Sequence, residues 1–200
     1  MSEIVNRDPM YWSLFWFVMA SWFVFAIAFL LRKRSEPSAK RVRNNRSIWG
    51  VLLMGVGMAL VWWIRRPVGT SFISNSLTAS YLLDVLACIL TITSIALVLS
   101  AVRLLGKQWN VRAILVEQHQ LITSGPYAIV RHPIYTGMFG LMLATGIANS
   151  TWYSLLLAIG FAFIGTLIRI RQEEGLLRET FGAEFDDYRK RVPAFLPWLR

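Results

Sequence analysis

The chain has 200 residues, of which 56% are apolar and only 16% are charged, and its formal net charge is +10. An ordinary soluble domain has about 45–50% apolar and about 25% charged residues, so this composition argues against a soluble globular protein and excludes a disordered one. A single cysteine excludes an intrachain disulfide framework, and two histidines argue against a zinc site. The excess of basic residues in so apolar a chain favours an anionic membrane surface over nucleic acid as its partner.

Long uncharged stretches predict where the chain crosses a membrane. Residues 10–31 hold no charge, and at ~1.5 Å per residue they would form a helix of ~33 Å, enough for the ~30 Å hydrocarbon core of a bilayer. Residues 47–64 are a second uncharged stretch, and residues 77–102 are a third that is interrupted only by Asp84. Each of the three is expected to be a membrane-spanning helix.

The fourth stretch, residues 134–168, is too long for a single span. A helix over its 35 uncharged residues would measure ~52 Å, well beyond the thickness of the bilayer core. Asn149-Ser150-Thr151 near its middle is typical of a turn, so two helices joined by a tight hairpin are expected. The sequence therefore predicts an all-α integral membrane protein with five transmembrane helices.

The positions of lysine and arginine predict the orientation of these helices. Seven basic residues lie in 32–46, four in 103–131 and seven in 169–200, against three on the other side of the predicted spans. Because cytoplasmic segments are enriched in Lys and Arg, the N-terminus is expected outside and the C-terminal part in the cytoplasm. Residues 1–103 then contain the first three helices, and residues 104–200 contain a polar loop, the helical hairpin and a cytoplasmic C-terminal cap.

A polar segment precedes the fourth predicted helix. Pro133 fits the first turn of that helix, which places Arg131 and His132 at its N-terminus. Unpaired backbone N–H groups and the positive end of the helix dipole lie at the same place, so we expect a carboxylate or phosphate there. The alternative is anchoring at the membrane surface, with Arg131 reaching toward water and Tyr127 and Tyr135 in an aromatic belt.

The last predicted span continues into a charged segment. Arg169 and Glu173 are four residues apart and share one helix face, whereas Arg171 and Glu174 are three apart on a different face. If Arg169 points into the bundle, it could hold an anionic group of a substrate, and Glu173 would suit a cationic or amino group. The alternative is a solvated helix face whose salt bridges contribute little.

Other features indicate structure rather than chemistry. Gly182 is expected to end the last long helix, and Phe185 and Tyr188 to turn one face of a short amphipathic cap toward the membrane. Gly55-Val56-Gly57 lies inside a predicted span, which favours close helix packing over nucleotide binding. Asp84, near the outer end of its span, is assigned an interfacial or packing role. The N-terminal half is expected to take no part in the chemistry.

Several motifs that are common individually occur here in one order. They are Leu121 to Tyr127, Arg131-His132-Pro133-x-Tyr135-x-Gly137, Glu173-Glu174, and Phe181-Gly182 followed by Tyr188, Val192-Pro193 and Leu196-Pro197. The ordered set, over about residues 104–199, resembles the isoprenylcysteine carboxyl methyltransferase family of integral membrane enzymes. The wider superfamily includes phospholipid N-methyltransferases and membrane sterol reductases.

This resemblance implies a helical membrane fold that binds S-adenosylmethionine without a Rossmann domain. It implies methyl transfer to a carboxylate of a lipophilic substrate, which would arrive from the bilayer while the cofactor arrives from the cytoplasm. The active site would face the cytoplasm, in the cytoplasmic membrane of a bacterium or archaeon or the endoplasmic reticulum of a eukaryote. Membrane lipids are the expected surroundings, and neither nucleic acid nor a metal is implied.

The resemblance also implies roles for individual residues. The implied cofactor-binding residues are His119, Gln120, Leu121, Ile122, Tyr127, Arg131, His132, Pro133, Ile134, Tyr135 and Glu173. Glu173 would hold the ammonium group of the cofactor, and Arg131 and His132 would hold its carboxylate. Arg169 is the implied catalytic residue, which aligns the carboxylate of the substrate.

Three other functions are compatible with the sequence. Methylation of a phospholipid amine, or of another small lipophilic nitrogen or sulfur compound, would use the same cofactor with an acidic substrate pocket. A reductase of the sterol-reductase type would instead bind NADPH. A membrane scaffold without enzymatic activity would bind neither cofactor.

Overall fold

The computed structural model describes residues 8–30, 47–68, 70, 72–73, 76–106 and 120–196. Regular structure in these residues is helical: α1 (Asp8–Leu30), α2 (Ser47–Trp63), α3 (Leu77–Leu105), α4 (Pro133–Asn149), α5 (Trp152–Phe181) and α6 (Ala183–Arg191). A short 3-10 helix, Gly125–Ala128, precedes α4. The predicted all-α fold is confirmed.

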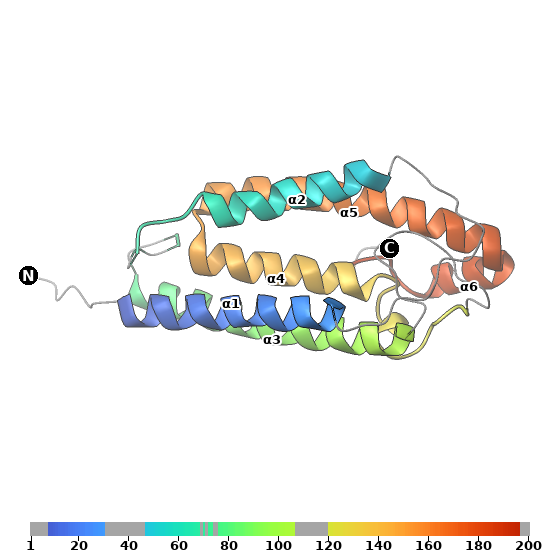
Figure 1. Cartoon of the computed structure of the whole chain (residues 1–200), viewed down its shortest axis with the longest axis horizontal. Helices are drawn as coiled ribbons and strands as arrows, with labels where there is room; N and C mark the ends of the chain where they lie inside the picture. Colours follow the sequence, from blue (N-terminus) through green and yellow to red (C-terminus); the bar gives the residue numbers. More distant parts are fainter. Residues whose placement is uncertain are drawn as a thin grey trace, which may run out of the picture.

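The five long helices run alongside one another in two layers with α4 between them (Figure 1). Helices α2 and α5 form one layer, and α1 and α3 form the other. Helix α5 extends beyond the body of the bundle, and α6 folds back from its end. This arrangement brings the start of α4 next to the C-terminal half of α5 at one end of the molecule.

The ends of the C-terminal helices agree with the local sequence signals. Pro133 is in the first turn of α4. Helix α4 ends at Asn149 and α5 begins at Trp152, so the predicted hairpin turn is confirmed. Gly182 caps the C-terminus of α5 with a φ of 52°, a left-handed backbone conformation that glycine adopts without a steric penalty. The hairpin turn lets α5 run back along α4, so that the charged part of α5 returns to the start of α4.

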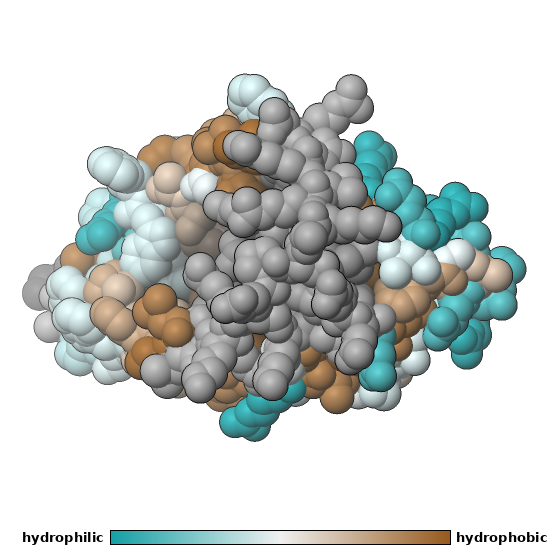
Figure 2. Space-filling view, turned by 45° about the vertical axis from the view of Figure 1, so that its right-hand side comes forward, coloured by the Kyte–Doolittle hydropathy of each residue, from teal (hydrophilic) through white to brown (hydrophobic). Residues whose placement is uncertain are grey.

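Long apolar helices are the main support for a membrane protein. In the described part of the chain, residues 9–28, 78–105 and 152–181 are long and apolar enough to cross a bilayer, and Ile48–Trp63 is a shorter apolar helix. Large apolar side chains such as Phe23, Leu30 and Trp63 are exposed on the bundle surface. Figure 2 shows hydrophobic residues in patches along the bundle, and the most hydrophilic residues mainly toward its right-hand end, with further polar residues at the left. The five-span arrangement and its orientation stay predictions.

Helices α2 and α5 approach closely where glycine replaces a side chain. A Cβ atom on Gly57 would lie 2.8 Å from the carbonyl oxygen of Ala158, and one on Gly165 would lie 2.6 Å from the carbonyl oxygen of Gly50. The predicted packing role is therefore confirmed for Gly57, whereas a Cβ on Gly55 would meet only open space.

Buried polar groups tie the hairpin turn to the other helices at the end far from α6. The Asn149 side-chain amide donates to the carbonyl oxygen of Val61 at 3.1 Å, and its oxygen accepts from the Tyr11 hydroxyl at 3.4 Å. The Arg66 guanidinium donates to the carbonyl oxygen of Ile147 at 2.6 Å, which places a positive charge at the C-terminal end of α4. Asn149 thus fixes tertiary contacts as well as forming part of the turn.

Asp84 lies at a groove of about 450 Å³ between α1 and α3, lined almost entirely by apolar atoms. Its neighbours there include Met10 and Phe17 of α1 and Cys88 of α3. All the residues that line this groove belong to α1 and α3, and none belongs to the charged segments before α4 and in the C-terminal half of α5. The interfacial or packing role of Asp84 stays a prediction.

Candidate active site

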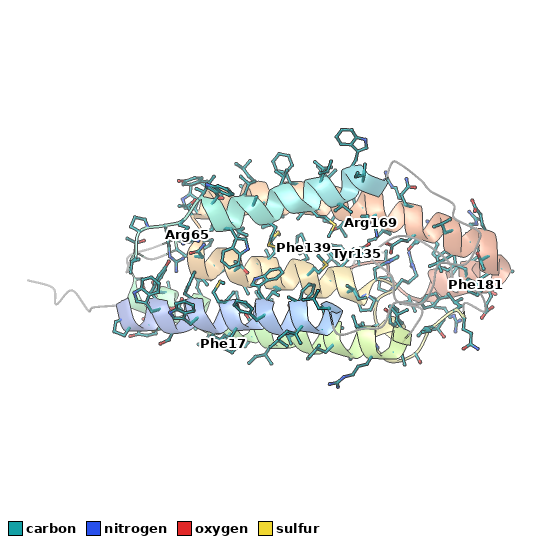
Figure 3. All side chains as sticks on the ribbon, viewed as in Figure 1. Phe17, Arg65, Tyr135, Phe139, Arg169 and Phe181 are labelled. Atoms are coloured by element: carbon teal, nitrogen blue, oxygen red, sulfur yellow. The ribbon has the colours of Figure 1, made fainter. Side chains whose placement is uncertain are left out.

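Charged and hydrogen-bonding side chains meet where the start of α4 contacts the C-terminal half of α5. Figure 3 shows Tyr135 of α4 and Arg169 of α5 close to each other at this end of the bundle. The set is called the charged cluster below. It comprises Arg131, His132, Tyr135, Arg169, Glu173 and Glu174.

Arg169, Tyr135 and Glu173 form a closed triangle of hydrogen bonds. Arg169 Nη2 lies 2.7 Å from Glu173 Oε1, and Arg169 Nε donates to the Tyr135 hydroxyl at 2.9 Å. The Tyr135 hydroxyl donates to the same Glu173 oxygen at 2.5 Å. The expected pair of Arg169 and Glu173 is therefore present. Because Arg169 is buried, the alternative of a solvated helix face is wrong for this residue.

His132 is buried between the two adjacent glutamates of α5. Its Nδ1 lies 3.5 Å from Glu173 Oε2, and its Nε2 lies 3.2 Å from Glu174 Oε1. Burial by itself disfavours the imidazolium, but the hydrogen bonds and negative charges of the two glutamates outweigh it and raise the pKa of His132 above its usual value. The ring also stacks on that of Tyr135, with centroids 5.9 Å apart.

The raised pKa of His132 makes stability depend on pH with a definite sign. The folded state binds this proton more tightly than the unfolded state, so the stabilisation is complete below the unfolded pKa of about 6.5 and is lost as pH rises through the folded pKa. We expect the free energy of unfolding to exceed that of a His132→Gln variant most at acidic pH, with the difference shrinking above about pH 6.5. Denaturant titrations in bicelles at several pH values measure it. A difference that does not change with pH would show that His132 has the same pKa in the folded and unfolded states, and a difference that grows with pH would show that it is neutral when folded.

Arg131 joins the start of α4 to the end of the chain. Its Nη2 and Nε lie 2.7 Å and 2.8 Å from Glu174 Oε1, so the carboxylate is bound through both nitrogens. Its Nη1 donates to the carbonyl oxygens of Val192 and Arg189, the latter at 3.1 Å. The side chain is 8% exposed. Arg131 therefore bridges α5 to the segment 192–196, which is called the C-terminal strap below.

Backbone hydrogen bonds attach the strap to the same helix end. The N–H groups of Arg131 and His132 donate to the carbonyl oxygens of Pro193 and Ala194, each at 2.9 Å. Phe195 is buried, and its ring contacts those of an α4 and an α5 phenylalanine, Phe139 and Phe163. The carboxylate expected beside Arg131 and His132 is thus present as that of Glu174, and the backbone N–H groups of the same two residues bind carbonyl oxygens of the strap. A role for Arg131 in holding the cofactor stays a prediction, and its side chain already has protein partners.

The remaining predicted cofactor residues lie before α4 or in its first turn. Tyr127 is buried in the 3-10 helix; burial first, and then the charges of Tyr188 and Glu173, raise the pKa of its hydroxyl. Ile134 packs against the cluster formed by Val98 and Val102 of α3. Of the others, Gln120 is exposed, Leu121 and Ile122 are half-buried, Pro133 is buried, and His119 lies outside the described residues.

The expected orientation of the C-terminal cap is wrong. Phe185 and Tyr188 do share a face of α6, but both are buried against protein. The Tyr188 hydroxyl donates to the carbonyl oxygen of Tyr127 at 2.6 Å, so α6 packs on the segment before α4. The pattern of one apolar face was correctly read, but periodicity alone does not distinguish a protein partner from lipid.

Glu174 belongs to the charged cluster, although the sequence interpretation assigned it no site role. It was expected to pair with Arg171, yet it contacts Arg131, His132 and Arg189, whose Nε lies 3.6 Å from Glu174 Oε2. The signal in the sequence was that Glu174 directly follows Glu173. Both glutamates lie near the imidazole of His132 in the structure.

Taken together, these features define a helical membrane protein with a cluster of paired carboxylates and guanidinium groups at one end of its bundle. The model of the isoprenylcysteine carboxyl methyltransferase (ICMT) family matches residues 85–179, and this region, just under half of the chain, belongs to the family. The matched region runs from α3 into α5 and contains the whole charged cluster.

The chain is similar to proteins named for metal resistance and to proteins named as methyltransferases. It is 30% identical over 78% of its length to the nickel-cobalt-cadmium resistance protein NccN of Alcaligenes xylosoxydans, and 28% identical over 78% to the cobalt-zinc-cadmium resistance protein CzcN of Cupriavidus metallidurans. These matches cover 66% and 65% of the two relatives, so the chain spans slightly less than two thirds of each. It is also 37% identical over 42% of its length to the protein-S-isoprenylcysteine O-methyltransferase of Schizosaccharomyces pombe, covering 35% of that protein.

Proposed function

We propose that the chain is an S-adenosylmethionine-dependent methyltransferase that methylates a carboxylate of a lipophilic substrate. The observation that carries the proposal is the partly buried triangle of Arg169, Tyr135 and Glu173 within the region that matches the family. It places a fork of guanidinium donors beside a carboxylate acceptor. These are the two complementary charges that a carboxylate substrate and a cationic cofactor require.

The charged cluster fits the cationic groups of the cofactor. Glu173 is 25% exposed at its side chain, against 12% for Glu174, so it is the more accessible carboxylate for an ammonium group. The Tyr135 ring beside it provides an aromatic surface that favours a neighbouring cation. When bound, S-adenosylmethionine supplies an electrophilic methyl group on a sulfonium.

The protein's part in the reaction is positioning rather than proton transfer. A substrate carboxylate is already ionised near neutral pH, so it needs alignment and exclusion of water more than a general base. Arg169 would bind that carboxylate through its planar guanidinium, whose orientation Tyr135 and Glu173 restrain. Because Glu173 also pairs with Arg169, it keeps the guanidinium from binding the substrate carboxylate, the nucleophile, too tightly.

We also propose that five helices cross the membrane with the charged cluster on the cytoplasmic side. The cluster lies at the end of α5 that leads into residues 169–200, one of the segments rich in Lys and Arg. A lipophilic substrate would then reach Arg169 from the bilayer. The buried Arg169 disfavours a phospholipid amine as the acceptor, because a cationic neighbour opposes an amine that must become positively charged.

Calorimetric titration in lipid nanodiscs tests the proposal. The wild type is expected to bind S-adenosylmethionine saturably, and Glu173→Gln to bind it about 10- to 100-fold more weakly, because it loses a charge-assisted hydrogen bond worth about 1.5–3 kcal/mol. Glu179→Gln, at an exposed glutamate of the same helix, is the matched control and should bind as the wild type does.

Two results would contradict the proposed methyltransferase, and a third would contradict only the role of Glu173. Binding of NADPH without S-adenosylmethionine would favour a reductase, and binding of neither would favour a scaffold. Equal affinity in Glu173→Gln and Glu179→Gln would retain the methyltransferase but remove Glu173 from the cofactor site. Thermal unfolding of each variant shows whether a change in affinity reflects a change in folding.

A further inference from the structure

We propose that Gly50 of α2 is a positioning residue for Arg169, so that the N-terminal half contributes to the reaction site. The inference rests on the proposed function, in which Arg169 aligns a carboxylate. Gly50 is buried against α5. A Cβ atom on it would lie 2.8 Å from Cγ and 3.3 Å from Cδ of Arg169, too close for the side chain to stay where it is.

The two helix backbones meet beside the stem of Arg169. Gly165 precedes Arg169 by one helical turn and faces α2, because its Cβ would lie 2.6 Å from the carbonyl oxygen of Gly50. In the other direction, a Cβ on Gly50 would lie 2.8 Å from the carbonyl oxygen of Gly165. The paired glycines let the backbones touch, and the aliphatic part of Arg169 lies directly against Gly50.

The guanidinium is restrained at its other end by Tyr135 and Glu173. An arginine side chain has several rotatable bonds, and fixing it in one conformation costs up to about 2 kcal/mol of rotamer entropy. Contact along its stem and hydrogen bonds at its tip together select one position. Gly50 would therefore act on the reaction through Arg169, without touching the substrate itself.

Helix α2 also supplies two matched controls. A Cβ on Gly55 meets open space, so Gly55→Ala adds the same methyl group with no contact. A Cβ on Gly57 would lie 2.8 Å from the carbonyl oxygen of Ala158 and 3.1 Å from the Cβ of Ala162. Gly57→Ala therefore disturbs the packing of α2 on α5 at about 10 Å along the helix from Gly50, away from Arg169.

The first measurement needs neither cofactor nor substrate. The Nε–H resonance of Arg169 in the ligand-free protein is assigned by its loss in Arg169→Lys. In Gly50→Ala this resonance is expected to shift or to exchange faster with solvent, because the hydrogen bond to Tyr135 is displaced. Gly55→Ala and Gly57→Ala should leave it unchanged. An unchanged resonance in Gly50→Ala, or an equal change in Gly57→Ala, would overturn the inference.

The second measurement is methyl transfer to an S-isoprenylated N-acetylcysteine. Gly50→Ala is expected to lose about 10- to 100-fold in kcat/KM, the effect of misplacing a reacting group by about 1 Å, while its affinity for S-adenosylmethionine stays that of the wild type. Gly57→Ala should not show this selective loss. If the wild type transfers no methyl group, the proposed function fails, and the resonance of Arg169 still decides whether Gly50 positions it.

A folding failure of Gly50→Ala would also be informative. In that case Gly50→Ala is combined with Arg169→Ala, which removes the Cγ that a Cβ at Gly50 would meet. Recovery of folding in the double variant would support the contact between Gly50 and Arg169. If the single and the double variant both fail to fold, the steric conflict lies between the new Cβ and the carbonyl oxygen of Gly165, and the inference is overturned.

Discussion

Replacing Arg169 by alanine is expected to reduce methyl transfer to a carboxylate substrate by about 10²- to 10³-fold, the usual effect of removing one preorganised electrostatic group. Binding of S-adenosylmethionine should persist, because Glu173 keeps its contacts with Tyr135 and His132. The loss should therefore lie in the transfer step. Transfer assays and calorimetry on the same preparation separate the two.

Two further variants show whether the shape of the guanidinium matters. Arg169→Lys keeps the charge but loses the planar fork, so it should recover only part of the activity. Arg178→Ala removes an exposed arginine of the same helix that pairs with Asp186, and it should behave as the wild type does. Full transfer by Arg169→Ala would show that Arg169 has a purely structural role.

Local rules account for the parts of this fold that were predicted. Pro133 in the first turn of α4, the turn at Asn149 and the cap at Gly182 depend on backbone geometry within a few residues. The pair of Arg169 and Glu173 follows from helical periodicity, because residues four apart face the same way. Each of these features is encoded in one short segment of sequence.

Contacts between distant segments could not be obtained in this way. Arg131 and Glu174 are 43 residues apart and on different elements, so nothing in either segment names the other as its partner. The positions of Arg131 and His132 before α4 indicated an acceptor but not its source, which is Glu174 for the side chains and the strap for the backbone N–H groups. Likewise, the helical pattern gave Gly50 no neighbour, since its contact with Arg169 depends on how α2 packs on α5.

The second large effect is expected at the pair formed by Arg131 and Glu174. Arg131→Met keeps much of the side-chain volume but leaves Glu174, 12% exposed, without its main partner. Removing one member of a buried ion pair costs about 3–5 kcal/mol, and the carbonyl oxygens of Arg189 and Val192 lose a donor as well. We expect a loss of that size in the free energy of unfolding, toward its lower end because Glu174 retains His132.

A double-mutant cycle with Glu174→Gln distinguishes this pair from general damage. If the two side chains act together, the double variant should be less destabilised than the sum of the single variants, by about 0.5–3 kcal/mol.

Limited trypsin digestion gives an independent readout. Lys190 lies beside the strap and is exposed, so detachment of the strap in Arg131→Met should speed cleavage after it. Additive energies with unchanged cleavage would mean that the strap is held by its backbone bonds and Phe195 alone. Because His132 contacts both glutamates, detachment should also loosen Glu173, which makes the strap part of what orders the proposed cofactor site.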